Sequence, residues 1–343
     1  MISVEPNPTT ALPAAGPISE VVGGLLSRPA SEIGATAAEA VSSFCGEVED
    51  PLGDDDLHLA LYLCFEQHYR SFPDVDPGWE WNPGLLAIRA ALEHRFLTAL
   101  EAELGPGEPV EPREVGEALF RIEAADEGVS LSRYLEAKAG IEEFREFVVH
   151  RSLYQLKESD PHSWAIPRLD GPAKTALLEV QGDEYGGGRP ERMHSVLFAK
   201  TMRALGLDDG ENAYLDRVPG ETLATVNLMS AFGLRRERRG AIVGHLAMFE
   251  MTSAQPNRRY GNALRRLGCG ADAIDFYDEH VEADAVHENI AAYDLAGALA
   301  RQEPEVTADI LFGARALLHL EDRFGRAVLA DWEAGRSSLR RAL

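Results

Sequence analysis

The segment HVEADAVH, residues 280–287, lies within a helix predicted for residues 271–299. Because a helix turns by 100° per residue, His280, Asp284 and His287 fall within about 60° of one another on one face. Imidazole nitrogens and carboxylate oxygens are ligands that suit iron, manganese or zinc. The alternative is a solvated acidic helix that happens to carry two histidines. The spacing therefore raises the hypothesis of a metal site, which needs further ligands elsewhere in the chain.

The rest of the chain is also helical in its pattern. Apolar residues recur at helical spacing in segments 54–72, 82–105 and 132–159. The second of these begins near Pro83 and stops at Gly105, the usual asymmetry of helix ends. Further helices are predicted over residues 171–186, 190–205, 219–234, 239–252, 256–267, 271–299 and 305–334. Since no long apolar–polar alternation is present, the predicted fold class is all-α, a bundle of long helices.

Three regions are expected along the 343 residues. Residues 1–53 are rich in Pro, Ala, Gly, Ser and Thr and are predicted to form a mobile N-terminal arm. Residues 54–125 are predicted to be auxiliary N-terminal helices. Residues 126–335 are predicted to form the main domain.

The overall charge narrows the class of partner. The net charge of −24 and the pI of about 4.8 disfavour binding to nucleic acid or to anionic membranes. No apolar run approaches 18 residues and no signal peptide is evident, so a soluble, cytoplasmic protein is expected. Cys45, Cys64 and Cys269 are scattered without CxxC spacing, which suits a reducing compartment.

A second segment offers ligands for a metal site. GDEYGGGRPERMH, residues 182–194, contains Glu184, Glu191 and His194, which share a face if the helix is continuous. Acid-x-x-His is the spacing of carboxylate-bridged di-metal bundles, in which two such pairs meet single carboxylates from other helices. The segment HVEADAVH supplies the second acid-x-x-His pair, Asp284 and His287. The glycines at 186–188 are expected to let the backbone bend or a substrate approach.

Two isolated glutamates could supply the single carboxylates. Glu250 stands in the apolar run HLAMFEMTS, where a buried acid is unfavourable without a partner. Glu158 in LYQLKES is the other candidate, although it could instead be a surface charge beside Lys157 at a helix end. Glu191 likewise has an alternative interpretation as a surface pair with Arg192.

The combination of LYQLKESDPHSWAIPRL, VQGDEYGGGRPERMH, FEMTSAQPNRRY and H-x-x-x-D-x-x-H resembles the haem-oxygenase-like di-iron oxidases and oxygenases. These proteins are also described as iron-containing redox enzymes, and the resemblance covers about residues 125–335. It implies a haem-oxygenase-like seven-helix bundle with additional N-terminal helices, holding two non-haem irons instead of haem. It also implies a homodimer.

The resemblance implies a set of metal ligands. Its six main members are Glu184, His194, Glu250, His280, Asp284 and His287. Glu191 and Glu158 match positions that supply additional carboxylates in the N-oxygenating branch. His280 and His287 are each expected to donate the proton of their second ring nitrogen to a neighbouring acceptor, which fixes the tautomer.

The implied activity is that of an O₂-dependent di-iron oxygenase with two Fe²⁺ ions as cofactor and O₂ as co-substrate. N-oxygenation of a small amine or amino-acid-like substrate to a hydroxylamine, nitroso or nitro product is favoured, because Glu158 and Glu191 match the carboxylate-rich branch. An external electron donor and a role in natural-product biosynthesis are expected. The alternatives are oxidative C–C cleavage, desaturation or hydroxylation of an amino or fatty acid, and a non-catalytic metal or ligand carrier. A true haem oxygenase is disfavoured, because an acidic centre is unsuited to the propionates of a porphyrin.

Overall fold

The computed structural model describes residues 12–31 and 36–343, so residues 1–11 and 32–35 lie outside the described part of the chain. It divides into two compact units, Met1–Leu100 and Glu101–Leu343. All regular structure in the described residues is helical, which confirms the all-α prediction. None of the helices described combines the length and the apolar character that a membrane span requires.

The first unit contains helices in the range for which the sequence predicts a mobile arm. Its elements are α1 (Pro17–Leu26), α2 (Thr36–Glu47), α3 (Asp55–Glu66), η1 (Pro77–Trp79) and most of α4 (Pro83–Leu104). The Asp56 carboxylate of α3 accepts the backbone N–H groups of Ile18 and Ser19 at 2.8 and 2.7 Å. This satisfies donors that the first turn of α1 leaves unpaired. Part of the segment 1–53 is therefore ordered by a residue that follows it in the sequence.

The second unit is built from eleven described α-helices and the short turns between them. The helices are α5 (Val115–Ala124), α6 (Leu131–Ala137), α7 (Ile141–Gln155), α8 (Asp160–Ser163), α9 (Gly171–Glu184), α10 (His194–Ala204), α11 (Gly220–Gly233), α12 (Arg239–Arg266), α13 (Ala271–Asn289), α14 (Gly297–Gln302) and α15 (Thr307–Glu333). The 3₁₀ turns are η2 (Pro112–Glu114), η3 (Ile166–Arg168), η4 (Gly186–Gly188), η5 (Pro190–Arg192), η6 (Arg236–Arg238) and η8 (Pro304–Val306). A π-helical segment, η7 (Ile290–Ala296), joins α13 to α14.

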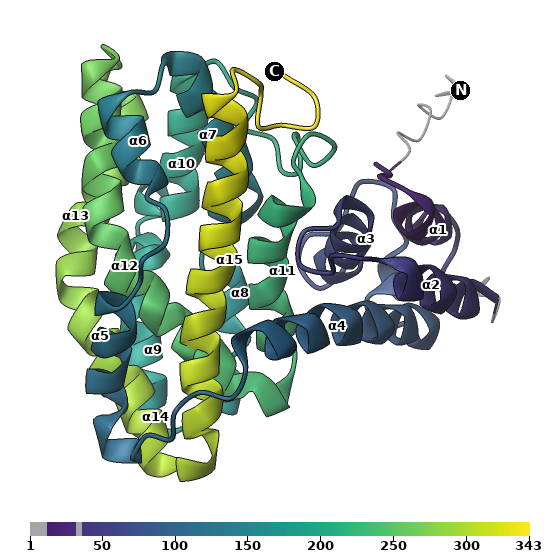
Figure 1. Ribbon diagram of the computed structural model, residues 1–343, viewed down its shortest axis with the longest axis horizontal. Helices are drawn as coiled ribbons and strands as arrows, with labels where there is room; N and C mark the ends of the chain where they lie inside the picture. Colours follow the sequence, from purple (N-terminus) through teal and green to yellow (C-terminus); the bar gives the residue numbers. More distant parts are fainter. Residues whose placement is uncertain (1–11, 32–35) are drawn as a thin grey trace, which may run out of the picture. The chain divides into compact units, whose positions relative to one another are not determined.

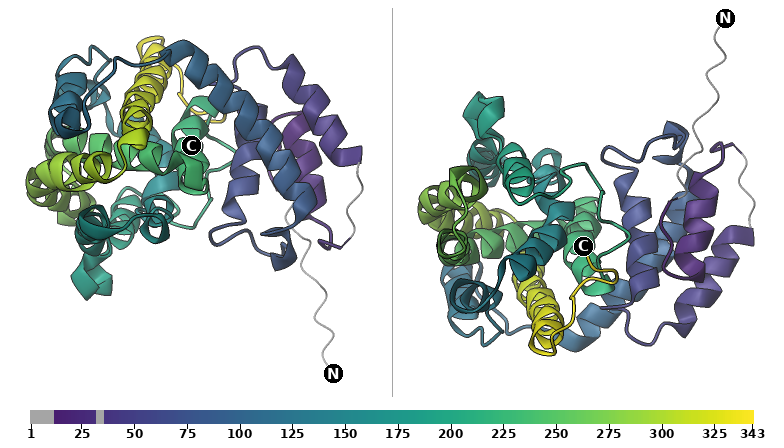
Figure 2. Two further views of the ribbon diagram at one scale, coloured as in Figure 1. Left: turned by 90° about the horizontal axis from the view of Figure 1, so that it is seen from below. Right: turned by 90° about the horizontal axis from the view of Figure 1, so that it is seen from above.

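Helix α12 packs against both α13 and α15, and these long helices run alongside one another (Figure 1 and Figure 2). Two glycines allow the close approach of α12 to α15. A Cβ atom on Gly244 would lie 1.8 Å from the carbonyl oxygen of Ile310. One on Gly313 would lie 2.0 Å from the carbonyl oxygen of Ala241. The absence of side chains at these two positions therefore sets the spacing between α12 and α15.

Two sets of element boundaries differ from the sequence-based predictions. The segment 132–159 forms two main helices, because the Gly140 N–H donates to the Glu143 carboxylate at 2.7 Å and starts α7. The segments 239–252 and 256–267 form a single helix, α12, that continues through Pro256. Helix α5 packs against α12 and α15 within the second compact unit, which begins at Glu101.

A buried histidine in α7 gives the second unit a pH-dependent stability. The ring of His150 lies between Thr222 Oγ1 and Ser338 Oγ, at 2.7 and 3.0 Å, and burial lowers its pKa to about 3. In the unfolded chain an ordinary histidine has a pKa of about 6.5 and takes up a proton that the folded chain excludes. The stability is therefore intact above about pH 6.5 and decreases as the pH falls toward 3.

We expect the replacement His150→Gln to remove this pH dependence. Between pH 7 and pH 5 the wild-type chain should lose about 2 kcal/mol of unfolding free energy through this group, and the variant should not. Urea denaturation at the two pH values measures the difference, and His94→Gln at an exposed position is the matched control. An equal loss for the wild type and His150→Gln would contradict this assignment.

Candidate metal centre

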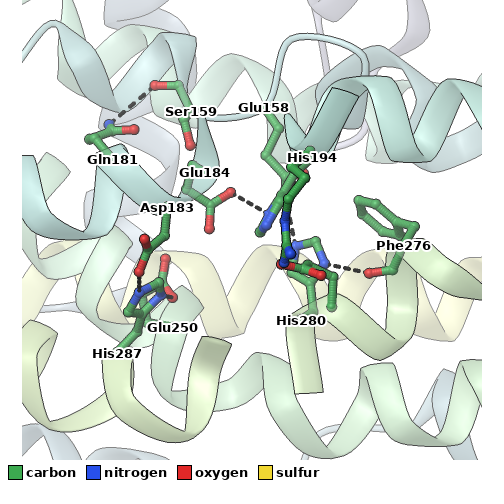
Figure 3. A network of polar contacts seen from close by, with 12 residues as sticks. Glu158, Ser159, Gln181, Asp183, Glu184, His194, Glu250, Phe276, His280 and His287 are labelled. Atoms are coloured by element: carbon green, nitrogen blue, oxygen red, sulfur yellow. Dashed lines mark hydrogen bonds and ion pairs between the residues drawn. The ribbon is translucent and has the colours of Figure 1, made fainter. Parts of the chain in front are cut away.

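Two groups of buried acidic and histidine side chains lie next to each other in the second unit. The first group is Glu158, Glu184, His194 and His280, and the second is Glu184, Glu250 and His287. Within each group, one ligand atom from every residue lies within 4.8 Å of the others. Because Glu184 belongs to both groups, they are adjacent (Figure 3). The structure therefore brings together six of the eight residues predicted as metal ligands.

These side chains come from five places in the chain. Glu158 follows α7, Glu184 ends α9, His194 begins α10, Glu250 lies in α12, and His280 and His287 lie in α13. A glycine turn brings the end of α9 to the start of α10, with positive φ angles of 76°, 58° and 81° at residues 186–188. A Cβ atom on Gly186 would lie 2.8 Å from the Arg192 carbonyl carbon. Only glycine fits this turn, which places His194 Nδ1 2.9 Å from Glu184 Oε2.

In the first group, Glu158 faces two imidazole rings. Its carboxylate oxygens lie 3.5 Å from His280 Nε2 and 4.0 Å from His194 Nδ1. The His280 Nδ1–H donates to the carbonyl oxygen of Phe276 at 2.8 Å, so its Nε2 carries the lone pair toward Glu158. The side-chain amide of Gln155 lies against Glu158, and with its nitrogen turned toward the carboxylate it donates to both oxygens, at 2.6 and 3.1 Å. Each of these contacts orients a ligand atom inward.

In the second group, His287 is held between two carboxylates. Its Nε2–H donates to Asp183 Oδ2 at 3.0 Å. Its buried Nδ1 lies 3.4 Å from Glu250 Oε2 and makes no hydrogen bond to the described residues. The prediction that His280 and His287 each bond to a further acceptor is thus confirmed. In histidines that bind metals, a hydrogen-bond acceptor at the ring nitrogen that faces away from the metal fixes the orientation of the ring.

The electrostatics of the two groups suit a cation. Burial raises the pKa values of Glu158 and Glu250, and the nearby histidines offset this only in part. Burial alone would lower the pKa of His287, but Glu250 and Asp183 outweigh it and raise the pKa to about 9. A proton on this ring therefore balances the carboxylates, and a divalent cation could take over that role. Carboxylates mixed with imidazoles form a donor set that fits iron.

The two remaining predicted ligands are not seen in these groups. Glu191 is exposed in η5 and belongs to neither group. The condition under which Glu191 would share a face with Glu184 and His194, one continuous helix, is not met, because the positive φ angles of the three glycines end α9 at Glu184. Asp284 lies in α13, between His280 and His287, but its side chain is outside the described residues.

Asp183 and Gln155 contact the site and were missed by the sequence analysis. Asp183 directly precedes Glu184, and neighbouring helical residues point about 100° apart, so a search for side chains on one face passes over it. Gln155 lies three residues before Glu158, a spacing that places both side chains on one face. That spacing was an available signal, but an amide gave no reason to suspect a metal site.

A cavity of about 520 Å³ extends from the first group, and Glu158 and His280 form part of its lining. It lies among α7, α10, α12, α13 and α15. Much of its wall is aromatic, with contributions from Phe147, Phe198, Phe249 and Phe276. A space of this size and character is typical of a site for a small organic molecule.

Residues 145–322, more than half of the 343 residues, match the sequence profile of a family described as iron-containing redox enzyme. The chain belongs to this haem-oxygenase-like family. Membership confirms the resemblance found in the sequence and, together with the helical structure, the predicted fold class. The family is described as one of redox enzymes, the class of activity that the resemblance implied.

A curated relative of this chain is a nitrosourea synthase from Streptomyces achromogenes subsp. streptozoticus. The two chains are 28% identical over 138 residues, which cover 40% of this chain and 29% of the synthase. The match thus spans less than a third of the length of the relative.

Proposed function

We propose that this protein is an O₂-dependent non-haem di-iron oxygenase that N-oxygenates a small amine or amino-acid-like substrate. The observation that supports this most directly is the pair of buried ligand groups that share Glu184. A carboxylate between two adjacent groups suits two metal ions held close together, as in two-metal enzymes. Membership in a family of iron-containing redox enzymes supports iron as the metal. A nitrosourea contains an oxidised nitrogen, so the nitrosourea synthase relative favours nitrogen as the atom oxidised.

The ligands divide between the two metal positions. Glu158, His194 and His280 would hold one iron, Glu250 and His287 the other, and Glu184 would serve both. When bound, the two ferrous ions would supply electrons for the reduction of O₂. Asp284, one helical turn after His280 on α13, stays a proposed ligand.

The side chains around the metal positions serve orientation and exclusion of water. The Phe276 carbonyl and the Asp183 carboxylate each hold one histidine ring by its outer nitrogen. The aromatic side chains in the lining of the cavity would limit the access of water to the reacting nitrogen once a substrate is bound. Conversion of an amine to a hydroxylamine places one oxygen atom of O₂ in an N–H bond and releases the other as water. This balance uses two electrons and two protons per turnover, for which we propose an external electron donor.

The test is to load the protein with Fe²⁺ without air and then to add ¹⁸O₂ and a panel of amines and amino acids. We expect one class of amine to accelerate the uptake of O₂ and to give a product that carries ¹⁸O on nitrogen, detected by mass spectrometry. Protein loaded with Zn²⁺ is the control, because zinc does not change its oxidation state. Oxidation of the bound iron without any oxidised organic product would contradict the proposal and would favour a metal carrier.

A further inference from the structure

The cavity beside the first ligand group contains a charged side chain that the metal positions do not use. Arg151 lies on α7, seven residues before Glu158, and both residues line the cavity. Its guanidinium donates to both Glu321 oxygens, at 2.7 and 2.6 Å, and lies over the rings of Phe147 and Phe324. Burial acts to lower the pKa of Arg151, but Glu321 outweighs this effect and raises it, so the charge is kept.

Arg151 has more hydrogen-bond donors than its partner uses. A guanidinium carries five N–H groups, and a two-point pair with a carboxylate occupies two of them. Both oxygens of Glu321 are already engaged by Arg151. The guanidinium of Arg151 therefore keeps donors beyond the two that bind Glu321.

Next to this pair is a hydroxyl group with no hydrogen-bond partner among the described residues. Tyr277 on α13 is 2% exposed and lines the same cavity, and its hydroxyl makes no hydrogen bond to any described residue. An unsatisfied buried hydroxyl is unfavourable unless a ligand completes it. Burial raises the pKa of Tyr277, so the hydroxyl stays protonated and can donate. The ring of Tyr260 contacts the rings of both Tyr277 and Phe147, and the guanidinium of Arg151 lies over Phe147, so the two donors lie in one part of the cavity.

The acidic side chains of the cavity do not compete for these donors. Asp126 and Glu127 are exposed. Asp322 accepts the backbone N–H of Val129 at 2.9 Å and the side chain of Arg326 at 2.7 Å. The remaining donors of Arg151 and the hydroxyl of Tyr277 thus call for a ligand with acceptor atoms, and a carboxylate is an acceptor that a guanidinium binds well.

We propose that Arg151 and Tyr277 bind the carboxylate of an amino-acid substrate whose distal amine faces Glu158 and His280. The placement of the substrate's distal amine beside Glu158 and His280 rests on the proposed function. Arg151 lies near the end of α7 and Glu158 in the turn that follows it, and at a rise close to that of a helix these seven positions correspond to roughly 10 Å. An extended chain advances about 1.2 Å per bond, so about six bonds between carboxylate and amine would span this distance once contacts at the ends are included. The substrate class is therefore a long-chain amino acid with a terminal nitrogen.

Calorimetric titration of the full, metal-free chain tests the carboxylate site without any turnover. The probes are 6-aminohexanoate, which has the expected length, and hexylamine, which lacks the carboxylate. We expect 6-aminohexanoate to bind at least about tenfold more tightly than hexylamine. Tyr277→Phe should lower the affinity for 6-aminohexanoate by about five- to tenfold and leave the affinity for hexylamine unchanged. The control is Tyr134→Phe, since the Tyr134 hydroxyl donates to Glu143 and lies outside the cavity.

A double variant tests the charged partner without leaving a buried charge unpaired. Arg151→Gln combined with Glu321→Gln should remove the preference for 6-aminohexanoate over hexylamine. Equal binding of the two probes by the wild type, or 6-aminohexanoate affinity that Tyr277→Phe does not change, would overturn the inference. Iron-dependent amine oxidation, measured separately, distinguishes the two proposals. If the protein oxidises an amine but does not bind 6-aminohexanoate selectively, only the proposed carboxylate site is contradicted. If it binds the probe selectively but oxidises no amine, only the proposed function is contradicted.

Discussion

The replacement Glu184→Ala is expected to lower the iron content from about two ions per chain to one or fewer and to abolish amine oxidation. Glu184 is the residue that the two ligand groups have in common among the residues the structure describes. Its loss removes one carboxylate from both metal positions at once, and changes even to the neighbours of metal ligands lower affinity by 10- to 100-fold. Removal of a shared ligand should lower the metal affinity by more than this factor at both positions.

Metal analysis after anaerobic Fe²⁺ loading and desalting measures this effect. Glu250→Ala affects only the second group and should lose at least one ion. Glu179→Ala, an exposed acid on the same helix as Glu184, is the matched control and should keep the wild-type iron content. Circular dichroism confirms that each variant is folded. Two ions per chain in Glu184→Ala would remove this residue from the set of ligands.

The helices of the second unit were largely predictable, because apolar periodicity depends on local sequence. The segments 171–186 and 305–334 correspond closely to α9 and α15. The helices of the first unit were not predictable in this way. Helix α1 is stabilised by Asp56, which lies 37 and 38 residues beyond the two N–H groups that it accepts. Composition describes the neighbourhood of a residue and carries no information about such a distant contact.

The candidate site was predictable where ligands lie on one helix or stand out chemically. His280 and His287 have the spacing of two helical turns, and Glu250 is an acid in an apolar run. Glu191 lies outside the two ligand groups because the shared face proposed for it requires helical angles through three glycines, and these adopt positive φ. Asp183 was missed because its partner, His287, lies 104 residues away. Side-chain pairing across helices depends on the packed structure and not on local spacing.

The packing of α12 against α15 leads to a second large effect, on stability. We expect Gly244→Ala to lower the free energy of unfolding by about 2–4 kcal/mol, because overpacking costs about 1–3 kcal/mol and sometimes more. The added Cβ would meet the Ile310 carbonyl oxygen at 1.8 Å, so the two helices would have to separate by roughly 1.5 Å. Backbone atoms of a long helix do not yield as the end of a flexible side chain does. The higher helix propensity of alanine, worth up to about 1 kcal/mol, offsets only part of this cost.

A matched glycine separates the packing effect from helix propensity. Gly182 also lies within a helix of the second unit, but a Cβ there would meet nothing within 4 Å. Gly182→Ala should therefore raise the stability by up to about 1 kcal/mol. Urea denaturation of both variants compares them directly, and equal stability would mean that α12 and α15 do not pack as closely as described. Because α12 also carries Glu250, the same displacement should weaken iron binding at the second group in Gly244→Ala and leave Gly182→Ala unaffected.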